Sequence, residues 1–353
     1  MPLDLHRVAA QIEVMGTDLQ AQGAERLVQL ERAIAALNSS GKATGYPPTT
    51  PPEEYRVLAT DGSHIDVDRH MPVRCSLINI SKVSLQYGTR PDARLESHAH
   101  LYATPEELSV PDPWGTGAVA LEGRLMGIKR SVEEVVGLAE MAEEAEDIPT
   151  LALVDGSLVL WGREEQSYPE YVRESLLNNG LLLALSRIKN VSREKPVAMA
   201  AYISLPRSAD MVRSLQSERE FDGLLDRDLF ARVLQAGERS DTFASTSPIV
   251  KERYGEHQVH FFYLKTEHEI ARVEVPVWVA EDEALLSLAH TLILDQCRKG
   301  MGYPTAIMEA HEQAVIGGRE RELFRQMVED ALAERGLPVY TSEKALSKRV
   351  RPV

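Results

Sequence analysis

Two apolar segments of this chain each run directly into the triplet Asp-Gly-Ser. The first is LATDGS at residues 58–63, and the second is LVDGSL at residues 153–158. Short apolar segments of this kind are typical of buried strands, and a carboxylate at the end of such a strand has a defined position at the sheet edge. The following glycine permits a sharp turn, so each strand is predicted to end at its triplet. If the two strands are neighbours, Asp61 and Asp155 lie close together.

Two carboxylates at such short range repel each other unless one is protonated or a cation neutralises them. A divalent metal ion is the usual solution, and ligation by oxygen atoms alone suits Mg²⁺ or Mn²⁺. The competing interpretation is that both triplets are only turns, because Asp-Gly is a common turn dipeptide. The spacing alone leaves both interpretations open.

The pattern of apolar residues divides the chain into four parts. Residues 1–44 predict an N-terminal helical arm, which Gly16 and Gly23 are expected to break, and residues 45–55 predict a Pro-rich linker. Residues 56–335 alternate short apolar strands with helical segments, which predicts an α/β domain with a C-terminal helical segment. Residues 336–353 predict a basic tail. The apolar face of the arm either packs on its own domain or contacts a partner.

The charge of the chain excludes a general nucleic-acid-coating protein. Its 39 Lys and Arg stand against 54 Asp and Glu, a formal charge of −15, whereas affinity for nucleic acid comes mostly from neutralising phosphates. Any contact with DNA must therefore use local basic patches, bound divalent cations or a partner. The two cysteines, Cys75 and Cys297, predict neither a disulfide framework nor a thiolate zinc site. With no long apolar stretch and a polar start, the protein is expected to be cytoplasmic, without membrane contact.

A third carboxylate for a metal site would come from the helix predicted within residues 119–145. Glu122, Glu133 and Glu134 are all available there. Glu134 follows Arg130 by four residues, which puts the two side chains on one face of a helix. The residues alone do not select one glutamate, and a surface position is the plain alternative for each of them.

A series of segments in this chain resembles the ordered motifs of the NurA nuclease family. They span residues 56–325 and read VLATDGSHIDVDRH, SLINISKVSLQYG, KRSVEEVVGLAEMA, TLALVDGSLVLW, AAYISLPRSADMV and GYPTAIMEAHEQAVI. The resemblance implies an RNase H-like mixed sheet flanked by helices and a metal-dependent deoxyribonuclease, a 5′–3′ exonuclease and single-stranded DNA endonuclease. It also implies a homodimer that works on DNA with a HerA-type hexameric ATPase and resects ends in double-strand break repair. Mn²⁺ is the metal that it favours, with Mg²⁺ as the alternative.

The resemblance also implies the acidic residues of the site. Asp61 matches the first metal-binding aspartate of the family, and Asp155 matches the third acidic motif. Glu134 is the best match to the helical glutamate, followed by Glu133 and then Glu122. The predicted metal ligands are therefore Asp61, Glu134 and Asp155, together with the C-terminal motif histidine, His311.

Phosphodiester hydrolysis needs an activated water and stabilisation of the charge on the phosphorus and leaving oxygens, and two cations roughly 3.5–4 Å apart serve all these needs. Asp61 is predicted to bridge such cations. His311 is predicted to be a ligand or a proton-transfer group. Tyr202, which matches the motif tyrosine, is predicted to position a phosphate or to stack on a base. A buried structural role is the plain alternative for Tyr202 and His311.

Two other functions stay open at this point. The duplicated triplet is compatible with an actin-like phosphotransferase that binds ATP, although the residues after each triplet lack the Gly- and Thr-rich pattern of such phosphate loops. The second alternative is a weakly active adaptor for the ATPase. Four arginines are candidate phosphate contacts, namely Arg207, Arg213, Arg319 and Arg321. The chain contains no Walker A segment, so any ATP hydrolysis is expected to come from another protein.

Overall fold

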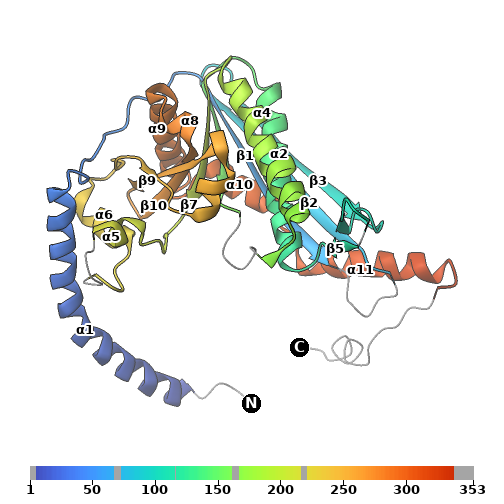
Figure 1. Cartoon of the computed structure of the whole chain (residues 1–353), viewed down its shortest axis with the longest axis horizontal. Coiled ribbons are helices and arrows are strands. Elements are labelled where there is room, and N and C mark those ends of the chain that lie inside the picture. The colour runs from blue at the N-terminus through green and yellow to red at the C-terminus, as the bar shows by residue number, and fades with distance from the viewer. Residues whose placement is uncertain (1–4, 67–72, 116, 161–166, 216–220, 338–353) are drawn as a thin grey trace.

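The computed structural model describes residues 5–66, 73–115, 117–160, 167–215 and 221–337 of the chain. An eight-stranded mixed sheet forms its centre, in the order β3-β2-β1-β6-β7-β10-β9-β8. Helices cover both faces of this sheet (Figure 1). The strands of the sheet are β1 (Tyr55–Asp66), β2 (Ser76–Tyr87), β3 (Asp92–Tyr102), β6 (Thr150–Asp155), β7 (Val197–Ile203), β8 (Phe243–Ala244), β9 (Val259–Lys265) and β10 (Ile270–Pro276). A separate hairpin consists of β4 (Ser109–Pro111) and β5 (Ala118–Ala120).

The helices follow the sequence pattern at most places. They are α1 (Leu5–Ser39), α2 (Arg124–Glu144), α3 (Glu170–Arg173), α4 (Leu183–Ser192), α5 (Asp210–Leu215), α6 (Asp226–Val233), α7 (Pro248–Arg253), α8 (Val277–Ala280), α9 (Glu283–Lys299), α10 (Thr305–Ala314) and α11 (Gly318–Ala333). A π-helical stretch, Glu174–Leu182, joins α3 to α4, and a short 3₁₀ turn spans Gly255–His257. Within the described ranges, no helix has the length and apolar character needed to cross a lipid bilayer.

The first five strands of the order have the topology of the RNase H-like fold. β1, β2 and β3 form an antiparallel meander, and β1, β6 and β7 are parallel to one another. Helix α2 connects the meander to β6, and the segment that ends in α4 connects β6 to β7. Antiparallel strands β10, β9 and β8 extend this core on the β7 side. The fold expected from the sequence is confirmed.

The central parallel strands are buried because helices lie on both sides of them. Every residue of β6 up to Val154, and every residue of β7 up to Tyr202, is buried. Such continuous apolar runs are what parallel strands require. β3 was not predicted, because ten of its eleven residues are exposed at the sheet edge and it carries no apolar run.

Helices α2 and α10 lie on opposite faces of β1. Thr60 donates a hydrogen bond to the carbonyl of Glu134 in α2 (2.9 Å), whereas the next residue, Asp61, contacts His311 in α10. Neighbouring residues of a strand point to opposite faces. The position of the first Asp-Gly-Ser triplet is therefore fixed from both sides of the sheet.

The N-terminal arm is one continuous helix of 35 residues, which leaves the body of the protein at one side (Figure 1). The prediction that Gly16 and Gly23 break it is wrong, because a single glycine in a helix costs only about 1 kcal/mol relative to alanine. Leu30, Ala33 and Leu37 anchor its C-terminal part in a second apolar cluster. The predicted basic tail lies outside the described residues, apart from Gly336 and Leu337.

Candidate active site

Asp61 and Asp155 lie side by side on the two parallel strands at the centre of the sheet. Thr60 of β1 is paired with Val154 of β6, and each aspartate is the next residue of its strand. Adjacent strands are roughly 4.8 Å apart, and the two side chains leave the same face. Burial and the charge of Asp61 raise the pKa of Asp155, against the lowering effect of a hydrogen bond from Tyr303. The two carboxylates therefore form a repelling pair.

The two Asp-Gly-Ser triplets have different backbone structures. β6 ends at Asp155, and Gly156 turns away with a φ of 92°. β1, by contrast, continues through its triplet to Asp66, because β2 stays paired with it: Asp61 lies opposite Ser81. The prediction that the first strand ends in a turn at its triplet is wrong, and the second triplet is the turn that was expected.

Gly62 is required by a close approach rather than by a turn. Glu134 of α2 reaches over it, so that a Cβ at position 62 would lie 2.8 Å from Glu134 Oε1 and 2.9 Å from Arg130 Cγ. The N–H of Gly62 also donates to Asp61 Oδ1 at 2.7 Å. The missing side chain is thus what lets a helical carboxylate come close to the aspartates.

Among the three candidate glutamates, Glu134 is the one that faces the aspartate pair. It is 7% exposed, and the charges of Asp61 and Asp155 both act on it. Glu133 forms an ion pair with Lys129 on its own helix (2.6 Å), and Glu122 forms one with Arg74 (2.6 Å) at the surface. Of the three, Glu134 therefore has the position that the predicted helical ligand needs.

Glu134 is held in an environment that disfavours its negative charge. Burial raises its pKa to about 8, the charges of Asp61 and Asp155 act in the same direction, and Arg130 opposes them. Arg130 Nε lies 3.1 Å from Glu134 Oε1, but neither atom has a hydrogen-bond partner within the described part of the chain. Oε1 is therefore a buried oxygen with an unused acceptor position beside two carboxylates.

His311 approaches the pair from the other face of the sheet. Its Nδ1 lies 2.8 Å from Asp61 Oδ2, and its side chain is 61% exposed. Ser81 of β2 and Ser63 of β1 donate hydrogen bonds to backbone carbonyls in the last turn of α10, at 2.7 and 2.5 Å. The serine of the first triplet thus helps to fix the helix that carries His311.

Tyr303, in the loop between α9 and α10, completes the surroundings of Asp155. Its hydroxyl donates to Asp155 Oδ1 at 2.9 Å. The loop depends on Gly302, which has a φ of 113° and whose Cβ would lie 2.5 Å from His268 Cδ2. Tyr303 was given no role from the sequence, although the Gly-Tyr-Pro segment that contains it was a signal for one.

Tyr202 has a different position from the one expected of it. It pairs with Asp155 across β6 and β7, but its side chain is fully buried. Its hydroxyl donates to Glu269 Oε1 at 2.6 Å, and its ring meets the ring of Tyr303 edge-on, with centroids 5.5 Å apart. This arrangement does not support contact of Tyr202 with a base or a phosphate. Tyr202 instead supports Tyr303, which agrees with the plain structural alternative.

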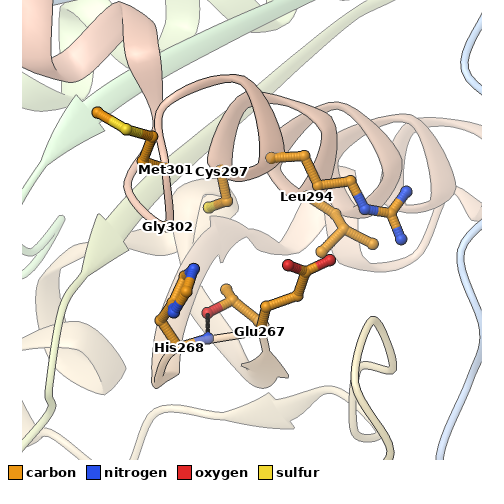
Figure 2. Close-up of a pocket in the computed structure, with 8 residues that line it drawn as sticks. Glu267, His268, Leu294, Cys297, Met301 and Gly302 are labelled. Atoms are coloured by element: carbon orange, nitrogen blue, oxygen red, sulfur yellow. Dashed lines mark hydrogen bonds between the residues drawn. The ribbon is translucent and has the colours of Figure 1, made fainter.

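A small cavity of about 190 Å³ lies next to this tyrosine pair, between α9 and the turn after β9 (Figure 2). Cys297, His268 and Met301 are among its lining residues, and Cys297 Sγ is 3.8 Å from the Tyr202 hydroxyl. Burial raises the pKa of Cys297 to about 12, so the thiol stays protonated. Neither aspartate lines this cavity. It lies beside the tyrosines that support the site and not at the carboxylates.

The donor set at the aspartate pair suits a hard divalent cation. It offers carboxylate oxygens from Asp61, Asp155 and Glu134, of which Glu134 Oε1 is buried without a hydrogen bond, and such oxygens are the ligands that Mg²⁺ and Mn²⁺ prefer. Each of the three carboxylates has a protein donor beside it in this structure. Across the described ranges, no three His, Cys, Asp or Glu side chains converge closely enough to enclose a metal ion. The ligands fit by type and charge, while their oxygens do not point to one centre.

The four candidate phosphate contacts do not share one environment. Arg321 is bound to the protein itself, since it donates to the backbone carbonyls of His64 (3.2 Å) and Ile316 (3.1 Å). Arg319 lies exposed on α11, Arg207 lies exposed between β7 and α5, and Arg213 lies exposed on α5. The last two are therefore available to an anionic ligand.

Comparison with known families and structures gives one consistent result. The sequence profile of the NurA domain matches residues 55–316, which is most of the chain and includes all the residues of the site. A comparison with curated proteins finds no match.

Solved structures of similar shape include several NurA proteins. The NurA nuclease from Sulfolobus solfataricus is 14% identical, with a TM-score of 0.55, over 92% of this chain and 98% of that chain. A second NurA structure is 10% identical, with a TM-score of 0.49, over 90% and 97% of the two chains. A third, NurA bound to dAMP and manganese, is 12% identical, with a TM-score of 0.42, over 94% and 98%. At these identities, the similarity to the first structure establishes the fold alone.

Proposed function

Because the chain belongs to the NurA domain family, we propose that it is a DNA nuclease that hydrolyses phosphodiester bonds with Mn²⁺ or Mg²⁺. One observation supports the proposal: Asp61 and Asp155 are adjacent on parallel strands, and Glu134 lies against Gly62, the residue after Asp61. Three acids in one place, of which Glu134 is buried, are costly to the fold unless cations balance their charge. Such a cost in folding free energy is expected where the same acids serve in catalysis.

Each residue of the site has a defined task under this proposal. Asp61, Asp155 and Glu134 would hold the metal, which supplies an activated water and stabilises charge on the phosphorus and leaving oxygens. Tyr303 orients Asp155 through its hydrogen bond. His311 has Nδ1 engaged with Asp61, so Nε2 is its atom for exchanging a proton with water or with the leaving oxygen.

The finer part of the proposal concerns the biological reaction. The family resemblance supports 5′–3′ exonuclease and single-stranded endonuclease activity, and resection of DNA ends by a homodimer with a HerA-type ATPase. Helix α1 supports a partner contact, because it exposes a group of large apolar side chains along its length. These are Leu5, Ile12, Val14, Met15, Leu27 and Val28.

The activity is tested with the full chain and end-labelled DNA. We expect cleavage of single- or double-stranded substrate with Mn²⁺ and none with EDTA. Asp155→Asn, purified in the same way, is the control for contaminating nuclease and should be inactive. Cleavage that persists in Asp155→Asn, or absence of cleavage by the wild type with either metal, would contradict the proposal.

The partner contact is tested on the arm. Ile12→Asp should weaken the dimer or the binding of a hexameric HerA-type ATPase, as measured by light scattering and co-sedimentation. Gln11→Asp introduces the same charge one residue away and is the matched control. Equal mass and equal ATPase binding for the two variants would rule out the arm as the contact.

A further inference from the structure

A groove opens at the sheet edge beside the second Asp-Gly-Ser triplet. It holds about 600 Å³ and includes Ser157, which is two residues after Asp155. Two residues span at most roughly 7 Å, so the groove begins within that distance of the Asp155 backbone. Ser157 is fixed there by a hydrogen bond to the buried Glu274 of β10 (2.7 Å), which also accepts from the N–H of Leu158 (3.0 Å).

The charges that line this groove leave a positive excess. Arg272 of β10 is nearly buried, and it pairs with both acids of the lining, Asp210 (2.7 Å) and Glu274 (2.9 Å). Arg207 and Arg213 also line the groove, and both are exposed. Neither side chain has an ion-pair or hydrogen-bond partner within the described ranges. The formal charge of the whole chain is −15, so a groove with two unpaired arginines has the opposite sign of charge from the chain as a whole.

The rest of the lining consists mostly of hydroxyl groups. Ser208, Ser245, Thr246 and Ser247 contribute, and the described lining residues include no aromatic ring. Guanidinium groups and hydroxyls donate hydrogen bonds to phosphate oxygens, often in pairs from one arginine. Bases, in contrast, are held by aromatic stacking. The chemistry of the groove matches a phosphodiester backbone and not the bases attached to it.

We infer that this groove binds the backbone phosphates of the DNA strand next to the bond that is cleaved, with Arg207 and Arg213 as the direct contacts. The inference rests on the proposed nuclease function for the identity of its ligand. Because the contacts lie beside the reacting bond and not on it, they hold substrate and transition state equally. Their loss therefore raises KM and leaves kcat nearly unchanged.

The test measures DNA binding separately from cleavage. A fluorescein-labelled 30-nucleotide poly(dT) strand is titrated with the full chain in EDTA at several salt concentrations. Arg207→Gln/Arg213→Gln should weaken binding by roughly tenfold for each lost contact at about 50 mM salt, and the salt slope should become shallower by about 1.4. The variant Arg207→Lys/Arg213→Lys keeps the charge and should recover most of the affinity.

The matched control removes the same charge at the opposite edge of the sheet. Arg90→Gln/Arg94→Gln changes two arginines that are each 74% exposed, in and beside β3, and it should leave affinity and slope unchanged. Equal losses in both double variants would show only a general charge effect and would overturn the inference.

The remaining outcomes separate this inference from the proposed function. If Arg207→Gln/Arg213→Gln binds and cleaves like the wild type while Asp155→Asn is inactive, the groove is wrong and the nuclease stands. If the wild type cleaves nothing but loses binding in the variant, the groove stands as a single-strand site without the nuclease. If the wild type does not bind the strand at about 50 mM salt, the groove inference is wrong.

Discussion

Replacing Gly62 by alanine should slow hydrolysis strongly and leave the fold intact. A Cβ at this position would lie 2.8 Å from Glu134 Oε1, 2.9 Å from Arg130 Cγ and 2.9 Å from Ile80 Cδ1. Ordinary contacts of such an atom begin at 3.4 Å. The carboxylate of Glu134 must therefore retreat by about 0.6 Å or more from the aspartate pair, since repulsion rises steeply below contact distance.

These distances give the expected size of the loss in kcat and of the loss in stability. A displacement of about 1 Å at a catalytic group costs roughly 10²-fold in rate, so we expect the kcat of Gly62→Ala to fall by that order. Overfilling a packed site costs about 1–3 kcal/mol, which lowers the Tm by a few degrees. Mn²⁺-dependent cleavage of a labelled strand gives kcat, and a thermal melt gives Tm.

Gly127→Ala is the matched control for this change. Gly127 lies on the same helix as Glu134, α2, and a Cβ there meets no atom within 4 Å. Alanine in a helix is favoured over glycine by about 1 kcal/mol, so this variant should keep full activity and an equal or higher Tm. A Gly62→Ala enzyme with a kcat within about threefold of the wild type would refute the reasoning that glycine is there for the approach of Glu134.

Three further predictions concern the same site. Asp61→Asn should remove metal-dependent cleavage and, in EDTA, leave the Tm equal to that of the wild type or above it, because a repelling charge is gone; a large fall in Tm would contradict this. Tyr303→Phe removes the donor to Asp155 Oδ1, so kcat should fall by roughly tenfold, as expected for a lost orienting bond worth about 1.5 kcal/mol; unchanged kinetics would show that Asp155 needs no such support. Burial raises the folded pKa of Glu134 from 4.5 to about 8, so the stabilisation by its protonated form is present below about pH 4.5 and is lost as the pH rises through 8. In EDTA, Glu134→Gln should therefore melt above the wild type at about pH 8.5 and approach it near pH 5, whereas an offset independent of pH would exclude the shifted pKa.

The two Asp-Gly-Ser triplets show how much of the site can be predicted from the sequence. Their letters are identical, and both aspartates were predicted to meet at one edge of a sheet. The backbone of each was not predictable from the triplet, because it depends on a neighbouring strand: β2 extends beside Gly62 and Ser63, whereas β6 has no partner that would carry it past Asp155. Local sequence sets where the carboxylates lie, and strand pairing sets the course of the backbone beyond them.

The tyrosines of the site show a second limit to what the sequence alone predicts. Tyr202 was selected by its motif, but no pattern in the sequence reveals that its side chain is fully buried and faces Glu269. The role of Tyr303 is not visible in the sequence, because its contact with Asp155 spans 148 positions and depends on how the α9–α10 loop lies. Contacts of this kind arise from packing between distant segments, which periodicity and spacing do not encode.

The acidic balance of the chain is compatible with an anionic substrate where the acids are paired with cations. On the outer side of α2, Glu140 pairs with Lys82 (2.5 Å) and Glu143 with Arg187 (2.7 Å). Glu134, in contrast, is buried, and its cationic neighbour Arg130 is on its own helix (3.1 Å). The field of a paired charge falls off quickly and is screened further by salt, so these surface acids contribute little repulsion at the groove. There, the arginines that do not have partners dominate, and on the proposed function a DNA strand reaches the carboxylates along that side and not across α2.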